Sequence, residues 1–508
     1  MHPPLLARDA SADSHSESQW PKLARGGSRW ALAGQLAAQG TSIVVFAVLC
    51  RWIAPADFGV FNTALLIVTL PRMLVQVGMN AAIVQRQQLD APGLSTLFWC
   101  NQLLSVACAA TAIGAGLIVA QLSGSTRLAV VTAALSGTTL VAALGATHLS
   151  LLDRALRSQR ASTLRWAAQA CAGGVAVVLA LQGRPLAALL AQQYVELAIL
   201  AVGAWQAESW RPGRGSGWAS IRSSLQLSRH VATTNLVFYV AQNADKLLLY
   251  VMLGGAAAGE TAIGMYTLAY GFMMKPVYLA STPISSVMLP ALARCVDRPA
   301  AYRELAVYFY RLAGAVLLPA GVGLLVVAED AMLVQAGGQW REAGTLLTLL
   351  APAVLVHGLF NITGSVLTSS GRTAWFVRVA LLVALVQLQG YAAGYGLGAM
   401  AVAPPWGHVY GVAASYSAVL VLVVFLPYLT VSLAQVGMHV WDVLRPLIPL
   451  VMASSCMGLV VWGLRRWLAA WPVWADGSPL VRLMISAAVG AAVYALLARR
   501  ELKSLLHG

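Results

Sequence analysis

The 508-residue sequence contains very little charge. Only 10% of its residues are Asp, Glu, Lys or Arg, against about 25% in ordinary soluble proteins. Hydrophobic residues make up 59% of the chain without counting its 45 glycines. A soluble domain of this length would lack the polar side chains needed to cover its surface. The shortage runs along the whole chain, so the composition excludes a soluble globular protein and predicts an all-α polytopic membrane protein.

Motifs for catalysis and nucleotide binding are also missing. No Gly-Lys dipeptide occurs, which excludes a GxxxxGK[ST] phosphate loop, and GxSxG, HExxH and Asp-x-Asp sequences are absent. The six cysteines stand singly, without CxxC spacing or a neighbouring His at metal-ligand spacing. The net charge is +15. No run of five or six like charges occurs, so the basic residues do not indicate a nucleic-acid partner. We therefore expect no enzyme, cofactor, metal site or disulfide framework.

Apolar runs of about 17 to 25 residues are long enough to cross the ~30 Å hydrocarbon core as helices. The first 28 residues are polar and lack the short apolar core of a signal peptide, so the first span is expected to stay in the mature protein. We predict fourteen spans: Arg29–Ile53, Val60–Ile83, Leu97–Ala120, Leu128–Leu151, Trp166–Gln182, Pro185–Trp205, Val231–Gly254, Ile263–Leu289, Leu305–Ala328, Leu346–Leu367, Trp375–Leu397, Val409–Leu429, Pro446–Gly463 and Leu483–Leu497.

The distribution of Lys and Arg tests this count, because cytoplasmic loops carry an excess of these residues. With the N-terminus inside, cytoplasmic segments hold 22 of them and outside loops hold seven. A missed or invented helix would scramble this bias. The sequence therefore predicts that both termini are cytoplasmic.

The longest loop, Gln206–His230, divides the spans into two groups. Trp218, Ile221 and Leu225 share one helical face there, beside arginines, which suits a short interfacial helix; a plain solvated connector fits equally well. We expect a cytoplasmic tail at 1–28, a six-helix lobe at 29–206, a linker at 207–230, a second six-helix lobe at 231–430, and two extra helices with a short cytoplasmic tail at 431–508.

The two lobes contain a sequence repeat. Phe58-Gly59-Val60-Phe61 opens the second span, and Ile263-Gly264-Met265-Tyr266 opens the eighth. The same offset carries Pro71 onto Pro276, and each proline adjoins a base, Arg72 or Lys275. Six helices separate the copies, and an even number keeps both in the same orientation. This pattern predicts parallel repeats with a binding site at their interface.

Six charged residues lie inside predicted spans, where each costs roughly 2.5 to 3.5 kcal/mol at a helix centre. They are Arg72, Glu196, Asp245, Lys246, Lys275 and Arg311. We interpret Arg72, Lys246 and Lys275 as binding an anionic group of a substrate. Asp245 and Glu196, the acids near mid-bilayer, are expected to carry a proton or to help hold Na⁺, because desolvation can keep a carboxylate protonated. Structural clamps, with Arg72 paired to Glu196 and Asp245 paired to another helix, remain the alternative.

Polar stripes on four spans predict a hydrated cavity. Their members are Gln35, Gln39 and Ser42 on the first span, Asn62, Thr69, Arg72, Gln76 and Asn80 on the second, Asn235, Tyr239, Gln242 and Lys246 on the seventh, and His357, Asn361 and Ser365 on the tenth. From these stripes Gln76, Asn235, Gln242 and Asn361 are expected to contact the substrate. The run Gly394-x-Gly396-x-Gly398 is instead expected to let two membrane helices pack closely.

Several short motifs together resemble bacterial polysaccharide flippases of the Wzx type, in the multidrug/oligosaccharidyl-lipid/polysaccharide exporter superfamily. They are Ala54-Pro55-Ala56-Asp57-Phe58-Gly59, Gln85-Arg86, Ser95-Thr96-Leu97-Phe98-Trp99, Asn243-Ala244-Asp245-Lys246, Tyr266-Thr267-Leu268-Ala269-Tyr270, Leu289-Pro290-Ala291-Leu292-Ala293-Arg294 and Gly338-Gln339-Trp340. The resemblance covers about residues 28 to 375. The sequence departs from the pattern at Gly255–Ala262, which is longer than the usual connection, and near Gln76, where an expected acid is missing.

The resemblance implies that the protein flips undecaprenyl-diphosphate-linked oligosaccharides across the bacterial inner membrane by rocking of two lobes, for exopolysaccharide or lipopolysaccharide export. A polysaccharide polymerase and export machinery are the implied protein partners. Two alternatives remain: a drug or peptidoglycan-precursor exporter of the same superfamily, and a polytopic glycan polymerase or glycosyltransferase. The polymerase is disfavoured because the outside loops are short, and the drug exporter because the first span has no acid.

Overall fold

The computed structural model describes residues 40–85, 91–154, 158–215, 217, 236, 239–240, 242–470 and 478–507. All regular structure within these ranges is helical, which confirms the predicted all-α class. The chain forms two compact units. Unit 1 contains the described residues up to Asn243 together with Tyr250–Glu260, and unit 2 contains Ala244–Leu249 and Thr261 onward. The helix at 242–253 therefore contributes to both units, whereas the sequence placed a boundary in the loop before it.

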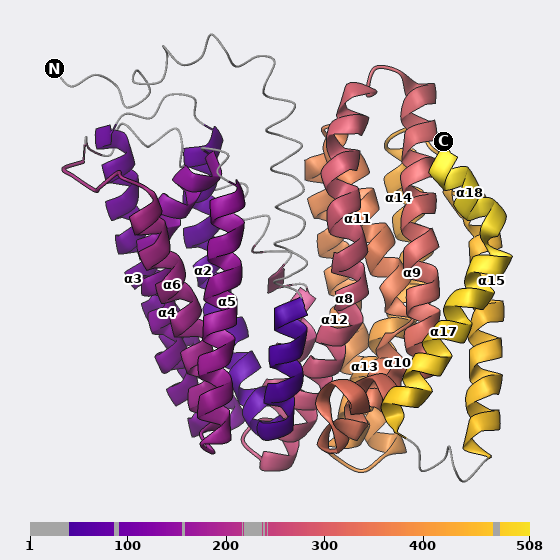
Figure 1. Cartoon of the computed structure of the whole chain (residues 1–508), viewed down its shortest axis with the longest axis horizontal. Coiled ribbons are helices and arrows are strands. Elements are labelled where there is room, and N and C mark those ends of the chain that lie inside the picture. The colour runs from indigo at the N-terminus through magenta and orange to yellow at the C-terminus, as the bar shows by residue number, and fades with distance from the viewer. Residues whose placement is uncertain are drawn as a thin grey trace. The chain divides into compact units, whose positions relative to one another are not determined.

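Unit 1 is a bundle of long helices that run alongside one another (Figure 1). Pro55 and Pro185 open two of them, at positions where the proline ring fits and no backbone donor is lost. Gly124 and Gly183 follow two others with φ of 73° and 75°, a conformation that glycine adopts without strain. The helices are Gly40–Trp52, α2 (Pro55–Gln85), α3 (Ala91–Ser123), α4 (Thr126–Arg154), α5 (Ser158–Leu181) and α6 (Pro185–Ala207).

Unit 2 contains most of α8 and all later helices (Figure 1). A π-helical turn, Val419–Val424, joins two of them into one continuous span. The helices are α8 (Ala257–Arg294), α9 (Pro299–Ala336), the 3₁₀ turn Gly338–Trp340, α10 (Arg341–Leu350), α11 (Ala353–Ser369), α12 (Thr373–Ala401), α13 (Trp406–Ala418), α14 (Phe425–Ala434), α15 (Val440–Ala469), α17 (Pro479–Leu497) and α18 (Arg499–His507).

Ten described helices are long and apolar enough to cross a membrane. The number is eleven if the segment Gly338–Leu350 and α11, which meet at an angle of 56°, form one broken span. The predicted first, second and seventh spans are represented by Gly40–Trp52, α2 and the helix at 242–253. The structure is compatible with fourteen spans, and that total stays a prediction.

The bend between α10 and α11 was not predicted, because the tenth apolar run is continuous in composition. Ala351 and Pro352 lie at the break. Proline supplies no backbone donor and its ring clashes with the preceding turn, so a helix commonly bends or ends there. Pro71 in α2 and Pro276 in α8 lie inside helices that continue past them.

Glycines bring α12 and α13 into close contact, as the sequence predicted. A Cβ added at Gly394 would lie 2.4 Å from the carbonyl oxygen of Gly411, and one at Gly398 would lie 2.0 Å from that of Gly407. Any side chain would therefore push the two helices apart. The prediction is wrong for Gly396, since a Cβ there would meet no atom within 4 Å.

Salt bridges connect the last helices of the chain to α9. Asp330 of α9, only 1% exposed, accepts hydrogen bonds from Arg465 of α15 at 2.7 Å and from Arg482 of α17 at 3.0 Å. Toward the other end of α9, Arg311 donates to Glu501 of α18 at 2.6 Å. The carboxylate of Asp330 is paired by two guanidinium groups, which satisfies a charge that would otherwise be costly to bury. Arg311 therefore forms an ion pair with Glu501, near the start of α18.

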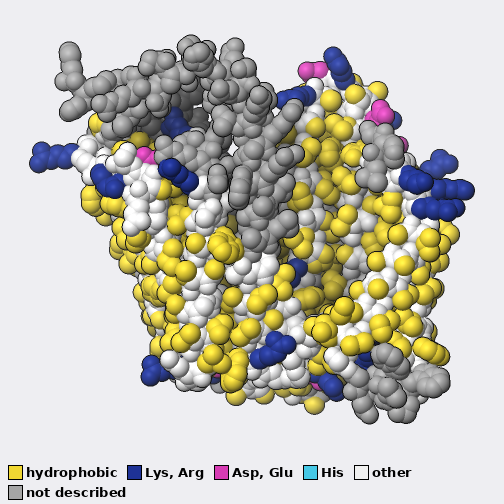
Figure 2. Space-filling view, in the orientation of Figure 1, with side chains coloured by type: hydrophobic (Ala, Val, Ile, Leu, Met, Phe, Trp, Pro, Cys, Tyr) yellow, Lys and Arg dark blue, Asp and Glu magenta, His cyan; other side chains and the backbone are white. Residues whose placement is uncertain are grey.

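Hydrophobic side chains cover the flanks of the helices in the view of Figure 2, while Lys and Arg gather near helix ends. Many large apolar side chains are strongly exposed, among them Leu103, Leu422 and Met400. A soluble protein rarely exposes apolar patches on this scale. Lipid is the environment that satisfies such a surface, and the chain is a multi-pass membrane protein.

Candidate functional site

The intramembrane charges of unit 1 come from two helices. Arg72 follows Pro71 in α2, and Glu196 lies in α6. Glu196 and the hydroxyl of Tyr239 are near enough to Arg72 to interact with it electrostatically. Arg72 is partly exposed, and its Nε is buried without a hydrogen-bond partner in the described part of the chain. The structure thus brings Arg72 and Glu196 together while leaving donor capacity on the guanidinium.

Tyr239 belongs to the same group of residues. Its hydroxyl donates to the backbone carbonyl of Leu66 in α2, at 3.2 Å, and it also interacts with the side chain of Thr69. Thr69, Arg72 and Tyr239 were placed on the polar stripes of the second and seventh spans by helical spacing alone. Their meeting in unit 1 is consistent with those stripes facing one another.

The charges of unit 2 are more deeply buried. Asp245 is fully buried and Lys246 is 6% exposed. Their side chains form an ion pair, with 3.4 Å between the Lys246 Nζ and Asp245 Oδ1 atoms. The hydroxyl of Tyr266 in α8 donates to the second carboxylate oxygen at 2.5 Å. Asp245 therefore has one cationic and one neutral hydrogen-bonding partner.

An aromatic cluster surrounds this ion pair. The Lys246 ammonium lies 3.4 Å from the ring centroid of Tyr270, a favourable position because the ring face is electronegative. Tyr416 of α13 donates to the Tyr270 hydroxyl at 3.4 Å and shares a short hydrogen bond with His357 of α11. These residues, with Tyr391 stacked on Tyr416, form what we call the tyrosine cluster: Tyr266, Tyr270, His357, Tyr391 and Tyr416.

The sequence missed most of this cluster. Tyr266 and Tyr270 were noticed only within a motif, and His357 only within a polar stripe. A single tyrosine in an apolar span does not by itself indicate a site before its neighbours are known. The i, i+4 spacing of Tyr266 and Tyr270 was the available hint, since it places both on one face of a helix.

The other predicted residues have different surroundings. The Lys275 ammonium lies 4.7 Å from the ring centroid of Phe272 and is partly exposed. Gln242 and Asn361 are exposed. Gln76 lies in α2, but its side chain is outside the described residues, as is all of Asn235. In the described part of the chain, no three His, Cys, Asp or Glu residues could hold a metal ion together.

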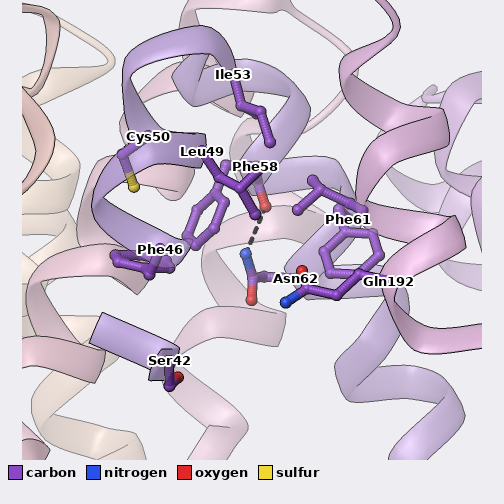
Figure 3. A pocket seen from close by; sticks show the side chains of 10 residues that line it. Ser42, Phe46, Leu49, Cys50, Ile53, Phe58, Phe61, Asn62 and Gln192 are labelled. Atoms are coloured by element: carbon purple, nitrogen blue, oxygen red, sulfur yellow. Dashed lines mark hydrogen bonds between the residues drawn. The ribbon is translucent and has the colours of Figure 1, made fainter. Parts of the chain in front are cut away.

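Unit 1 also contains a pocket of about 160 Å³. It lies between the helix Gly40–Trp52, α2 and α6. Figure 3 shows the side chain of Gln192 extending toward Asn62, whose amide nitrogen is bonded to the Phe58 carbonyl, with aromatic rings nearby. Ser42 and Asn62 belong to predicted polar stripes, whereas Gln192 was not predicted. The lining residues are Ser42, Phe46, Leu49, Cys50, Ile53, Phe58, Phe61, Asn62, Leu189 and Gln192.

A charged network at the helix starts of unit 1 was also missed. Arg127, at the start of α4, pairs with Asp57 of α2 and with Glu260, which is 3.0 Å away and 3% exposed. Ser125 and Tyr250 donate to Glu260 at 2.9 and 3.1 Å. Asp57 and Glu260 lie in the first turns of α2 and α8. Hydrogen-bonding residues far apart in sequence thus fix the beginnings of α2 and α8.

The chain beyond α6 packs against neighbouring helices in its described part. Residues 208–215 are non-helical. The amide of Gly213 donates to Ser95 at 3.0 Å, Trp99 donates to the Gly213 carbonyl at 3.1 Å, and Trp210 is buried beside His148. The segment is therefore docked on α3 and α4. Trp218, Ile221 and Leu225, on which the interfacial helix was predicted, lie outside the described residues.

Comparison with known sequences assigns the family. Residues 48–345 match the family described as "Polysaccharide biosynthesis protein". The chain belongs to this family. Among its relatives, the lipopolysaccharide biosynthesis protein WzxC of Escherichia coli (strain K12) is 25% identical over 86% of this chain and 88% of its own length. The teichuronic acid biosynthesis protein TuaB of Bacillus subtilis (strain 168) is 22% identical over 93% of this chain and 94% of its own length.

Solved structures share the fold of this family member. The lipid II flippase MurJ, in an inward closed conformation, covers 94% of the chain with a TM-score of 0.72, and 99% of MurJ is covered at 12% identity. A multidrug resistance MATE family transporter covers 78%, with a TM-score of 0.61 at 12% identity and 94% of its own length covered. The family match and these folds confirm the resemblance drawn from the sequence motifs.

Proposed function

We propose that this chain flips undecaprenyl-diphosphate-linked oligosaccharides from the inner to the outer leaflet of the bacterial inner membrane. The observation that carries this proposal is membership of the polysaccharide biosynthesis family, with WzxC aligned over most of both chains. The succinoglycan biosynthesis transport protein ExoT of Rhizobium meliloti (strain 1021) is a further relative, 23% identical over 63% of this chain and 64% of its own length. Exopolysaccharide or lipopolysaccharide export is the process served.

The charged residues supply a route for an anionic lipid headgroup. Arg72 in unit 1, with Lys246 and Lys275 in unit 2, would bind the diphosphate, because charge-assisted hydrogen bonds can replace its lost hydration. Gln76, Asn235, Gln242 and Asn361 would contact the substrate around them. Lipid-linked oligosaccharide and membrane lipids are thus the principal partners, and a polymerase with export machinery would take up the product.

Ion coupling is assigned to Asp245 and Glu196. Each is an acid inside a predicted span and has a cation nearby, Lys246 or Arg72. One of them would carry a proton or help hold Na⁺ in the return step. No covalent chemistry is needed for this function, so the protein would act as a transporter and not as an enzyme.

Both termini are proposed to be cytoplasmic. Exposed bases gather at the end of unit 2 where α9 and α15 begin and α18 lies: Arg298, Arg303, Arg445, Arg499, Arg500 and Lys503. The contacts of Arg303 with Gly437 and of Arg311 with Glu501 place these segments together. Cytoplasmic ends of membrane proteins are enriched in such bases. A reporter fusion at Trp474 should respond as outside and one at His507 as inside, and a cytoplasmic response at Trp474 would refute the fourteen-span topology.

A deletion strain tests the function itself. Loss of the protein should make lipid-linked repeat units accumulate on the inner leaflet while polysaccharide disappears from outside the cell. Normal polysaccharide with accumulated peptidoglycan precursor would assign the chain to the peptidoglycan-precursor alternative. Accumulation of single repeat units on the outer leaflet would indicate a polymerase.

A further inference from the structure

The pocket of unit 1 has no assigned role in binding the diphosphate. Its ten lining residues include no Lys, Arg, His, Asp or Glu. A phosphate group entering it would lose hydration without meeting a cation, which is strongly unfavourable. The pocket is therefore suited to an uncharged ligand.

The polar side chains of the pocket call for a ligand that forms hydrogen bonds. Among the described residues, Gln192 and Ser42 have no hydrogen-bond partner, and Asn62 uses one amide hydrogen on the Phe58 carbonyl at 2.8 Å. Covering the Gln192 amide with a hydrocarbon would leave it unsatisfied, at a cost of about 1–3 kcal/mol. An isoprenoid chain is thus a poor occupant, although the pocket lies in a membrane helix bundle.

The remaining walls are aromatic and aliphatic. Phe46 and Phe58 meet edge to face, with 5.6 Å between their ring centroids, and Phe61 adds a third ring to the lining (Figure 3). Aromatic faces carry negative potential and attract C–H edges. A ligand with hydroxyl groups on its rim and C–H groups on its faces matches both kinds of wall.

The size of the pocket limits the ligand to one ring. Its volume of about 160 Å³ is below the roughly 300–1,000 Å³ of sites that hold drug-sized ligands. We infer that this pocket, formed by Asn62, Gln192, Ser42 and three phenylalanines, is a subsite for a single neutral sugar ring of the transported glycan. The inference deepens the proposed function and rests on it for the source of the sugar.

A reporter thiol tests occupancy without measuring transport. The full chain, with its six cysteines replaced by Ser, would carry Ser42→Cys and be reconstituted in vesicles of phosphatidylethanolamine and phosphatidylglycerol. Free glucose, galactose or mannose should slow labelling by a small thiol reagent, about tenfold at a sugar concentration near ten times the Kd, since only the empty fraction reacts. Ile43→Cys is the matched control, because Ile43 is 39% exposed and does not line the pocket. Its labelling should not change.

The same assay contains the outcomes that would overturn the inference. Protection of Ser42→Cys by farnesol instead of a sugar would assign the pocket to an isoprenoid chain. Protection by inorganic diphosphate alone would assign it to the headgroup, and unchanged labelling with every probe would mean that no sugar subsite exists. These results are independent of whether the chain flips lipid-linked glycans, so failure of the proposed function is detected separately.

A second measurement links the pocket to transport. Gln192→Leu keeps the volume of the side chain but removes its amide, and should lower the flipping of a lipid-linked oligosaccharide by about tenfold, the effect of one lost hydrogen bond worth about 1.4 kcal/mol. Gln193→Leu makes the same change one position along α6, at a residue outside the pocket, and should leave flipping near the wild-type rate. Equal rates for the two variants would contradict a role of the pocket in transport.

Discussion

The two units hold their intramembrane cations differently. In unit 2, the Lys246 ammonium is paired with Asp245 and covered by the Tyr270 ring, and both charged side chains are buried. In unit 1, Arg72 is partly exposed and its buried Nε has no partner in the described part of the chain. Glu196 interacts with Arg72 only by electrostatic attraction between the two charged side chains. One cation is therefore satisfied within its unit, while the other keeps unused hydrogen-bonding capacity.

This difference predicts which cation can receive an anion directly and which must first part from its carboxylate. A buried, fully paired charge stabilises the fold only through its partner, and removing one member leaves an uncompensated charge. A cation with an unused donor can bind an incoming anion without first breaking an ion pair. We therefore expect changes at Asp245 to affect folding first, and changes at Arg72 to affect transport first.

The largest effect is expected from Asp245→Ala. It leaves the Lys246 ammonium buried without its carboxylate, and loss of one partner of a buried pair costs about 3–5 kcal/mol. The amount of folded protein in the membrane and its thermal unfolding temperature in detergent should both fall sharply. Asp245→Asn combined with Lys246→Met removes both charges and should recover much of the lost stability. If the double variant were as unstable as Asp245→Ala, the ion pair would not be the source of the effect.

Arg72→Ala should cause the next largest effect, and it should appear in transport. Hydrogen bonds to charged groups contribute about 1.5–3 kcal/mol, so flipping at low substrate concentration should fall about 10- to 100-fold while the amount of folded protein is maintained. Arg72→Lys keeps the charge but loses the bidentate geometry, and should be milder. Normal polysaccharide export by Arg72→Ala, or loss of the protein from the membrane, would place Arg72 with the structural charges.

The sequence predicted the membrane helices well and the contacts between them poorly. Long apolar runs identify spans by composition, so α3, α9 and α15 were each located, although each helix extends about three to eight residues beyond the predicted span at either end. The bend at Pro352 and the π-helical turn at Val419–Val424 were missed, because hydropathy does not register backbone geometry. Proline did offer a signal in the first case; a run of valines and leucines offered none in the second.

The site shows the same limit. Asp245 and Lys246 were recognised because charged residues are rare within membrane spans, but their pairing was not predicted. Adjacent residues of a helix point about 100° apart and do not ordinarily face each other; the long lysine side chain makes the 3.4 Å contact. His357 meets Tyr416 across 59 residues of sequence. Such contacts depend on tertiary packing, for which a single sequence contains no direct signal.

A smaller effect is expected at Lys275. Its ammonium contacts the Phe272 ring and is partly exposed, so Lys275→Ala removes a more exposed contact than the buried pair of Asp245 and Lys246. A cation–π contact in such a position contributes about 0.5–1 kcal/mol, and folding should change little. Flipping should fall several-fold in vesicles without loss of folded protein. If unfolding temperature and flipping fell together, Lys275 would resemble Lys246 more than Arg72.

Glu196→Gln should have the smallest effect on stability. It tests directly whether Arg72 depends on a partner within unit 1, as Lys246 does in unit 2. Glu196 is partly exposed, and glutamine keeps the size and hydrogen-bonding capacity of the side chain while removing its charge. Because Arg72 does not depend on Glu196 as a close partner, the free energy of unfolding should change by no more than about 0.5 kcal/mol, as is usual for substitutions that break no buried pair. The proposed coupling role predicts a different result in transport: flipping driven by an imposed proton or Na⁺ gradient should lose its dependence on that gradient, while binding of the anionic substrate is kept or strengthened. Gln193→Leu, three residues earlier in α6, serves as the control for altered helix packing. Full gradient dependence in Glu196→Gln and in Asp245→Asn would exclude coupling through these two acids.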